Sequence, residues 1–159
     1  MFWHRLDETW VEQVAALEHS IAVSPWSAEM LREEMRLGSW QQVVLAGTLQ
    51  DARLAGYIVA RPQLDEWHLM TLGVAPAFRR QGVGRRLLQG VMDAACRCHA
   101  RCLLLEVRIS NHAACKLYLE LGFKILSVRR GYYPKGPMGP EDALVMALEW
   151  PAGARLSNP

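Results

Sequence analysis

Apolar residues recur along the chain with two different periods, and these periods predict where helices and strands lie. Trp10, Val14, Leu17 and Ile21 have helical spacing, which predicts an amphipathic helix. Short apolar runs between turn residues predict strands. The expected strands are Phe2–Leu6, Gln42–Gly47, Leu54–Arg61, Trp67–Ala75, Cys102–Val107, Phe123–Val128 and Ala143–Glu149.

Cap residues and the helical spacing of apolar residues predict three further helices. Ser27 is expected to cap a helix that stops at Gly38, a third helix begins near Val83, and a fourth follows a cap at Ser110 or Asn111. Their inner faces are expected to carry Met30, Leu31 and Met35, then Val83, Leu87, Leu88, Val91 and Ala95, then Ala114, Leu117, Tyr118 and Leu121, with Gly122 as the last stop. Pro62 should halt the strand before it, and 129–140 reads as a long loop. The chain is thus an α/β protein, a mixed sheet with helices packed on it.

The stretch Leu69–Gln89 carries the clearest functional signal of the chain. It is predicted to form a buried strand, a basic loop and a helix. Gly82 and Gly84 leave the main chain bare just before the helix. A helix N-terminus offers N–H groups and positive charge, and Arg79, Arg80, Arg85 and Arg86 add full charges. This combination suits a pyrophosphate. Leu87 replaces the third glycine of a dinucleotide fingerprint, so a plain turn with solvated arginines stays open.

Composition and charge argue against several classes of function, among them nucleic-acid binding and membrane insertion. The 159 residues suit one domain, and a net charge of +2 gives no strong field toward nucleic acids. We expect no membrane span, and the N-terminus lacks the build of a signal peptide, which points to the cytoplasm. Cys96 and Cys98 fall late in a helix on roughly opposite faces. They should be reduced thiols, like Cys102 and Cys115, and not zinc ligands.

Two residues are candidates for proton transfer. Glu106 interrupts an apolar strand, so it is either paired with an arginine such as Arg108 or a general base. Tyr118 lies on the inner face of its helix, where it is either core or an acid. Asn111 reads as a cap. Trp26, Tyr132 and Tyr133 lie in expected loops and could line a pocket or cover the core.

Several motifs resemble those of one family. The segment 79–85, Arg-Arg-Gln-Gly-Val-Gly-Arg, is similar to the R/Q-x-x-G-x-G/A signature of the GNAT N-acetyltransferases. The segments 105–111 and 117–123 resemble the second half of that superfamily. The segment 129–134 and Pro25-Trp26-Ser27 further resemble the RimI group, which acetylates the N-terminal alanine of ribosomal protein S18.

The resemblance implies a fold, a cofactor and roles for residues. It implies a twisted, mostly antiparallel mixed sheet of six to seven strands flanked by about four helices, in which the strands ending near Val74 and Val107 splay apart. Acetyl-CoA would enter there without a metal. Its contacts would come from Leu72, Gly73, Val74, Arg80, Gln81, Gly82, Val83, Gly84, Arg85 and Asn111. Glu106 would be the base and Tyr118 the acid.

The resemblance also implies the bounds of the domain and the partner that it modifies. Residues 1–150 would form one acetyltransferase domain and 151–159 a flexible tail. The substrate would be the N-terminus of S18, with Trp26, Tyr132 and Tyr133 around its first residues. The enzyme would be a monomer or weak dimer, and it would bind neither nucleic acid nor membrane. A lysine or small-amine acceptor, or an acetyl-CoA-sensing module without turnover, stays open.

Overall fold

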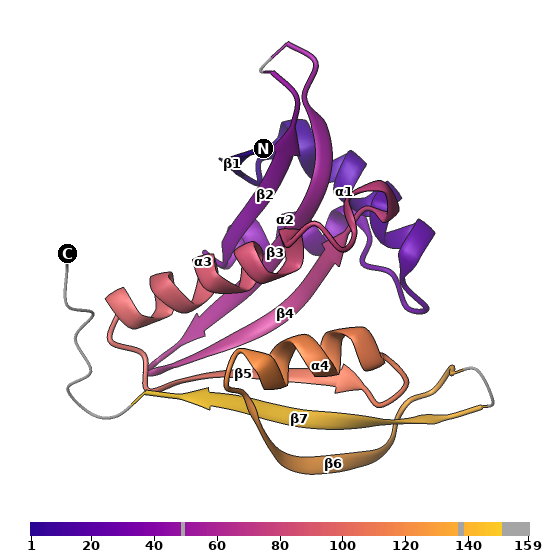
Figure 1. Ribbon diagram of the computed structural model, residues 1–159, viewed down its shortest axis with the longest axis vertical. Helices are drawn as coiled ribbons and strands as arrows, with labels where there is room; N and C mark the ends of the chain where they lie inside the picture. Colours follow the sequence, from indigo (N-terminus) through magenta and orange to yellow (C-terminus); the bar gives the residue numbers. More distant parts are fainter. Residues whose placement is uncertain (49, 137–138, 151–159) are drawn as a thin grey trace. The chain divides into compact units, whose positions relative to one another are not determined.

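The computed structural model describes residues 1–48, 50–136 and 139–150 (Figure 1). These residues form seven strands, four α-helices and one 3-10 helix. In chain order the elements are β1 (Phe2–Arg5), α1 (Glu8–Ile21), α2 (Ala28–Arg36), β2 (Trp40–Ala46), β3 (Arg53–Gln63), β4 (Glu66–Val74), η1 (Pro76–Phe78), α3 (Val83–Arg97), β5 (Cys102–Arg108), α4 (His112–Glu120), β6 (Lys124–Tyr133) and β7 (Glu141–Glu149). The predicted mixed sheet flanked by four helices is confirmed.

The seven strands follow the order β1-β2-β3-β4-β5-β7-β6, and the elements group into two compact units. The first unit comprises Met1–Arg61 and Met70–Val91, and the second comprises Pro62–Leu69 and the chain from Met92 onward. Strand β4 therefore contributes its first residues to the second unit and its last residues to the first.

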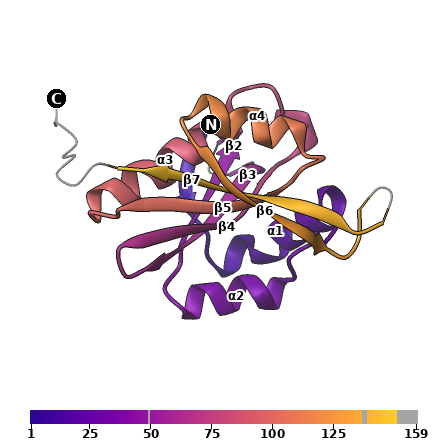
Figure 2. The same ribbon diagram turned by 90° about the horizontal axis from the view of Figure 1, so that it is seen from below.

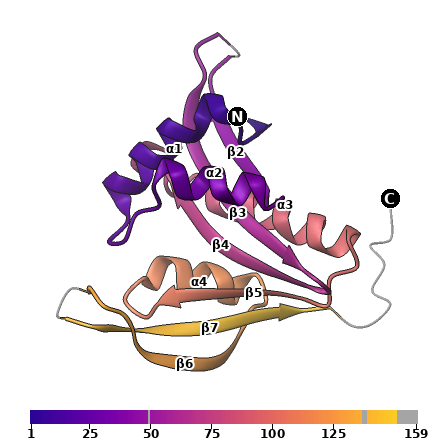
Figure 3. The same ribbon diagram turned by 180° about the vertical axis from the view of Figure 1, so that it is seen from behind.

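In the first unit, helices cover both faces of the antiparallel strands. Figures 1 and 3 view the molecule from opposite sides, and α3 lies in front of β2 and β3 in one view, α1 and α2 in the other. Asp7 caps α1 through the N–H of Thr9 at 3.0 Å, and Ser27 caps α2 through that of Met30 at 3.2 Å. The core between α1, α2 and the strands gathers Leu6, Trp10, Val11, Val14, Ala15, Leu31, Val43, Leu45, Tyr57 and Val59.

In the second unit, parallel and antiparallel pairs meet at β5. Residues Glu66–Leu69 of β4 pair in parallel with Cys102–Leu105, while β7 pairs antiparallel with β5 on one side and β6 on the other. Helix α4 lies alongside β5 and β7 (Figures 1 and 2). Asn111 caps this helix by accepting from the N–H of Ala114 at 3.2 Å, and Gly122 follows it with a φ of +92°.

Two predictions about the strands and helices of the first part of the chain are wrong in detail. Strand β3 continues through Pro62 to Gln63. Its pairing with β2 runs from Arg53 to Ala60, so Pro62 lies beyond the residues that pair with β2, and its missing N–H breaks no hydrogen bond to that strand. Met30 is 46% exposed. Glu34, one turn from Met30, is buried instead, because Arg61 and Ser39 donate to its carboxylate.

The first part of the expected loop 129–140 is strand. Strand β6 runs on to Tyr133, and β7 begins at Glu141, so Tyr133 and Glu141 are cross-strand partners. The register shifts between Arg129 and Tyr133, which breaks the alternation that would have signalled a strand. The N–H of Gly131 donates to Asp142 Oδ1 at 2.8 Å across this irregular stretch. The predicted tail 151–159 lies outside the described residues.

Two further findings concern the described part of the chain. None of its helices combines the length and the apolarity needed to span a bilayer. Its four cysteines are free thiols, with Cys102 buried and Cys98 exposed, and no group of three His, Cys, Asp or Glu side chains in these residues is arranged to hold a metal ion.

Candidate active site

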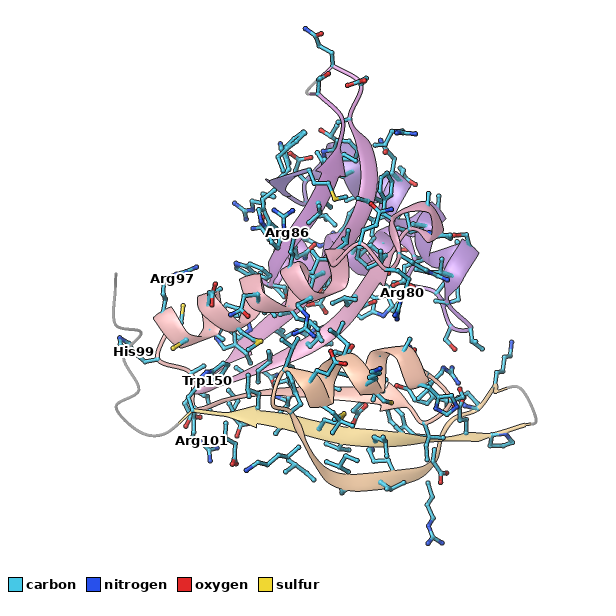
Figure 4. All side chains as sticks on the ribbon, viewed as in Figure 1. Arg80, Arg86, Arg97, His99, Arg101 and Trp150 are labelled. Atoms are coloured by element: carbon cyan, nitrogen blue, oxygen red, sulfur yellow. The ribbon has the colours of Figure 1, made fainter. Side chains whose placement is uncertain are left out.

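The basic loop before α3 has two residues in the left-handed conformation. Arg80 has a φ of +61° and Gly82 a φ of +79°. Such turns point successive N–H groups toward the same side and form anion-binding concavities. Gln81 donates to the carbonyl of Ala77 at 2.9 Å, which closes the loop on itself. Figure 4 shows Arg80 in this loop and Arg86 along α3.

Helix α3 places its own N-terminus directly after this loop. The N–H of Arg86 donates to the carbonyl of Gly82 at 3.0 Å, so the helical ladder starts at Gly82. The N–H groups of the first turn have no acceptor within the helix. Val83 is buried and Gly82 is exposed, which anchors the helix and leaves its first turn at the surface. The loop and helix end together can bind a diphosphate.

The strand segment Leu72–Val74 is held against β3 by a close contact. A Cβ on Gly73 would lie 2.3 Å from Cε1 of Tyr57, so no other residue fits there without moving the ring. The N–H of Ala75 donates to the carbonyl of Ala55 at 2.9 Å just beyond the segment. The main chain from Leu72 to Val74 is therefore fixed by β3.

Glu106 lies in β5, where its side chain is 29% exposed and paired with an arginine. The partner is Arg129 of β6, which is the kind of arginine pairing that one of the two sequence interpretations expected. The guanidinium of Arg129 also stacks over the ring of Tyr132 at 4.1 Å. A hydrogen bond to Glu106 is the main cause that raises the pKa of Tyr132. The carboxylate thus faces one cation and one phenol.

Arg108 contacts the end of β6 and the start of β7. It donates to Glu141 Oε2 at 3.0 Å and to the carbonyl of Lys135 at 2.6 Å. Its guanidinium lies 3.9 Å from the centre of the Tyr133 ring. Glu141 completes the cluster by accepting from the N–H of Ser110 at 2.8 Å. These contacts fix the end of β6 and the residues that follow it.

Tyr118 is buried on α4 and packs against Phe123, with the ring centres 5.6 Å apart. Burial raises the pKa of Tyr118 above its usual value of 10, and the charges of Cys115 and Tyr133 add to the effect. Burial also raises the pKa of Tyr133 to about 12, with the charge of Glu106 as the next cause. Tyr118 therefore keeps its proton at neutral pH.

The second unit thus brings together four of the predicted residues. Arg129 joins Glu106 to the ring of Tyr132, and the rings of Tyr132 and Tyr133 have their centres 5.0 Å apart. The charge of Glu106 contributes to the raised pKa of Tyr133, and that of Tyr133 to the raised pKa of Tyr118. The first unit holds the predicted cofactor loop and strand segment. It also holds Trp26, which is partly buried and packs against the core of that unit.

Sequence reasoning missed Arg129 and the pair of Arg108 and Glu141 as parts of the site. Arg129 was assigned to a loop, and only its place three residues before Tyr132 could have signalled a role. Glu141 follows Gly139 and Pro140, where a strand start is hard to read.

Comparisons with known proteins agree with this geometry. The model of the acetyltransferase (GNAT) family matches residues 7–123. The ribosomal protein bS18-alanine N-acetyltransferase of Escherichia coli K12 is 42% identical over 99 residues, which span 62% of this chain and 66% of that protein. The matched region is therefore slightly under two thirds of that relative. The protein of the same name from Haemophilus ducreyi is 34% identical over 145 residues, 89% of this chain and 97% of that one.

A solved structure extends the likeness to the fold. The crystal structure of the ribosomal-protein-S18-alanine N-acetyltransferase from E. coli superposes with a TM-score of 0.85 at 32% identity and covers 99% of both chains. The family model spans most of this chain, and the strand and helix arrangement is that of a solved relative. The chain therefore belongs to the acetyltransferase (GNAT) family.

Proposed function

We propose that this protein is an acetyl-CoA-dependent N-terminal acetyltransferase that modifies the N-terminal alanine of ribosomal protein S18. The observation that carries the proposal is the cluster of Glu106, Tyr132 and Tyr133 around Arg129 in the second unit, which also holds the buried Tyr118. It combines a carboxylate that can take a proton with a buried phenol that retains one. The names of the relatives support S18 as the acceptor.

The first unit offers groups that suit acetyl-CoA. The left-handed turn at Arg80 and Gly82 and the first turn of α3 would bind the pyrophosphate through N–H groups from Arg80 to Arg85, Gln81, Val83 and Gly84 included. The main chain of Leu72–Val74 would bind the pantetheine arm, and Asn111 would contact its end. Bound there, acetyl-CoA supplies the acetyl group as a thioester.

The protein's own groups then handle the protons in a direct transfer within a ternary complex. Glu106 takes a proton from the α-ammonium group of the acceptor, directly or through a water. N–H groups of Leu72–Val74 polarise the thioester carbonyl. As the new C–N bond forms and the C–S bond breaks, Tyr118 donates its proton to the departing thiolate. The nitrogen of the new amide gives up its second proton, which passes through water and restores the phenol of Tyr118. This route needs neither a covalent enzyme intermediate nor a metal ion.

The acceptor class follows from basicity. A protein α-amine has a pKa of about 8, against about 10.4 for lysine, so a carboxylate of modest strength can deprotonate the former more readily. We place the first residues of the acceptor against Tyr132, Tyr133 and Trp26. Tyr132 is 41% exposed and Tyr133 half-buried beside it, with their ring centres 5.0 Å apart. We further propose that residues 1–150 act as one domain, in the cytoplasm where S18 is made.

The experiment is a peptide assay with purified protein and acetyl-CoA. A peptide with the N-terminal sequence of S18 should gain one acetyl group on its α-amine, located by fragmentation mass spectrometry. Glu106→Gln and Tyr118→Phe should each lower kcat by about 10²-fold or more, with acetyl-CoA affinity unchanged by calorimetry. Near wild-type kcat in both variants would contradict the assigned roles.

Matched substrates separate the acceptor classes. The same peptide with a blocked N-terminus and an internal lysine, and a panel of small amines, should remain unmodified. Acetylation of those acceptors in place of the S18 peptide would move the activity to another acceptor class. Acetyl-CoA binding without release of CoA thiol for any acceptor would identify a sensing module instead.

A further inference from the structure

Glu18 is a buried carboxylate that the proposed chemistry does not use. It lies in the last turn of α1 and is 2% exposed. A carboxylate there is doubly unfavourable, because burial removes its hydration and the C-terminal end of a helix carries partial negative charge. Glu18 continues the apolar stripe of Trp10 and Val14, at a position where a leucine would serve packing alone. Its presence therefore needs another reason.

Three donors from three segments satisfy this carboxylate. The hydroxyls of Tyr57 on β3 and Thr71 on β4 donate to Oε1, the latter at 2.6 Å. The N–H of Trp26, in the segment between α1 and α2, donates to Oε2 at 3.3 Å. All of these residues belong to the first unit, and all three donors are neutral.

The donors connect the two parts of that unit which the proposed reaction uses. Thr71 directly precedes Leu72–Val74, and the ring of Tyr57 lies against Gly73 within that segment. Trp26 belongs to the segment proposed to face the acceptor. One carboxylate thus ties the strand that would polarise the thioester to the segment that would receive the amine.

We infer that Glu18 is a positioning residue that holds the 22–27 segment in register with Met70–Val74 of β4. The inference rests on the proposed function. Glu18 touches neither substrate, and it acts through Trp26, Thr71 and Tyr57. Its effect should be large on the alignment of the acceptor and small on the affinity for acetyl-CoA, because the loop before α3, which Glu18 does not touch, would still bind the pyrophosphate.

Two substitutions separate positioning from charge. In Glu18→Gln the amide oxygen can accept from the N–H of Trp26, while the amide NH₂ donates to the two hydroxyl oxygens, since a hydroxyl can also accept. Glu18→Leu fills similar volume but leaves all three donors without an acceptor. The glutamine variant should therefore preserve the register, and the leucine variant should lose it.

Glu34→Leu is the matched control. Glu34 is also a buried carboxylate on a helix of the first unit, but its named partners, Arg61 and Ser39, lie outside both the 22–27 segment and β4. It should lower thermal stability without changing the kinetics.

The readouts are steady-state kinetics with the S18 peptide and amide hydrogen exchange. Glu18→Leu should raise the KM for the peptide about tenfold and lower kcat, as loss of a buried hydrogen bond does, with acetyl-CoA affinity changed less than about threefold. Glu18→Gln should stay within about threefold of the wild type. Exchange at Trp26 and at residues 70–74 should quicken together in Glu18→Leu alone.

Each outcome is decisive. Equal kinetics and equal exchange in Glu18→Leu and Glu34→Leu would overturn the inference, because Glu18 would then be merely structural. Should Glu18→Leu fail to fold, Thr71→Val removes one donor and should still quicken exchange across 70–74; no change there would also overturn it. Should the wild type leave the S18 peptide unmodified, the proposed function fails, while the exchange data still test the role of Glu18.

Discussion

The guanidinium of Arg129 on β6 donates to the carboxylate of Glu106 on β5, and the pair reaches across β7, which lies between those strands. The candidate base is thus engaged by a cation of the protein itself. An incoming ammonium group would compete with Arg129 for the same carboxylate. Because both members of the pair are partly exposed, this competition should be mild.

Arg129→Ala should lower the KM for the acceptor peptide. A partly exposed ion pair contributes about 1 kcal/mol or less, so the gain should not exceed about fivefold. We expect kcat to stay close to the wild type, measured in the peptide assay at fixed acetyl-CoA. Arg130→Ala, at the exposed neighbouring position, is the control and should change neither constant. A tenfold loss of kcat in Arg129→Ala would mean that the guanidinium orients the base.

Tyr118→Phe should change how stability depends on alkaline pH. Burial raises the pKa of Tyr118, so the folded protein keeps a proton that the unfolded chain releases near pH 10. This contribution is complete below that pH and is lost as the pH rises above it, by about 1.4 kcal/mol per pH unit. Urea unfolding at pH 9, 10 and 11 should show the wild type losing stability more steeply than the variant. Parallel curves would contradict the shift.

Gly73→Ala should destabilise the protein, because the new methyl group would lie 2.3 Å from the ring of Tyr57. Overpacking of this kind costs about 1–3 kcal/mol, measurable by urea unfolding. Tyr57→Leu removes the obstructing ring, so the same glycine change should cost less in that background. Gly82→Ala has open space around the added methyl group and bears only the strain of its positive φ. Full additivity of the two changes at Gly73 and Tyr57 would contradict the contact.

Glu141→Gln should weaken the protein only above mildly acidic pH. The hydrogen bond from Ser110 lowers the pKa of Glu141, and Arg108 adds to the effect. The stability that the charged carboxylate contributes is present above its ordinary pKa of 4.5 and is lost as the pH falls through the lower folded value. The difference in unfolding free energy between wild type and variant should therefore shrink below pH 4.5. A difference that stays constant down to pH 3 would contradict this.

The helices were predictable because packing and capping follow local rules. Val83, Leu87, Leu88, Val91 and Ala95 are all buried on α3, as their spacing predicts. Asn111 and Ser27 cap α4 and α2 through their own side chains. The strand, loop and helix of Leu69–Gln89 could be predicted for the same reason, since the glycines and arginines that indicate the loop lie within a few residues of one another.

The buried charges were not predictable, because their partners are far away in the chain. Glu34 replaces Met30 on the inner side of α2 only because Arg61 reaches it from β3. Glu18 is buried through donors 8, 39 and 53 residues away. Arg129 meets Glu106 because β6 extends beyond Val128, where the sequence pattern ended the strand, and Arg129 still pairs with Ala143 of β7.

Strand β6 ends the order of the sheet, and the side chains of Ile125, Leu126 and Val128 on it are about half exposed. An outer strand offers main-chain groups to any second strand that approaches, and positive side chains such as Lys124 and Arg130 oppose that approach. Concentrated salt screens this repulsion. Aggregation of the purified protein should therefore increase with ionic strength, and dilute buffers are the better choice for storage and crystallisation.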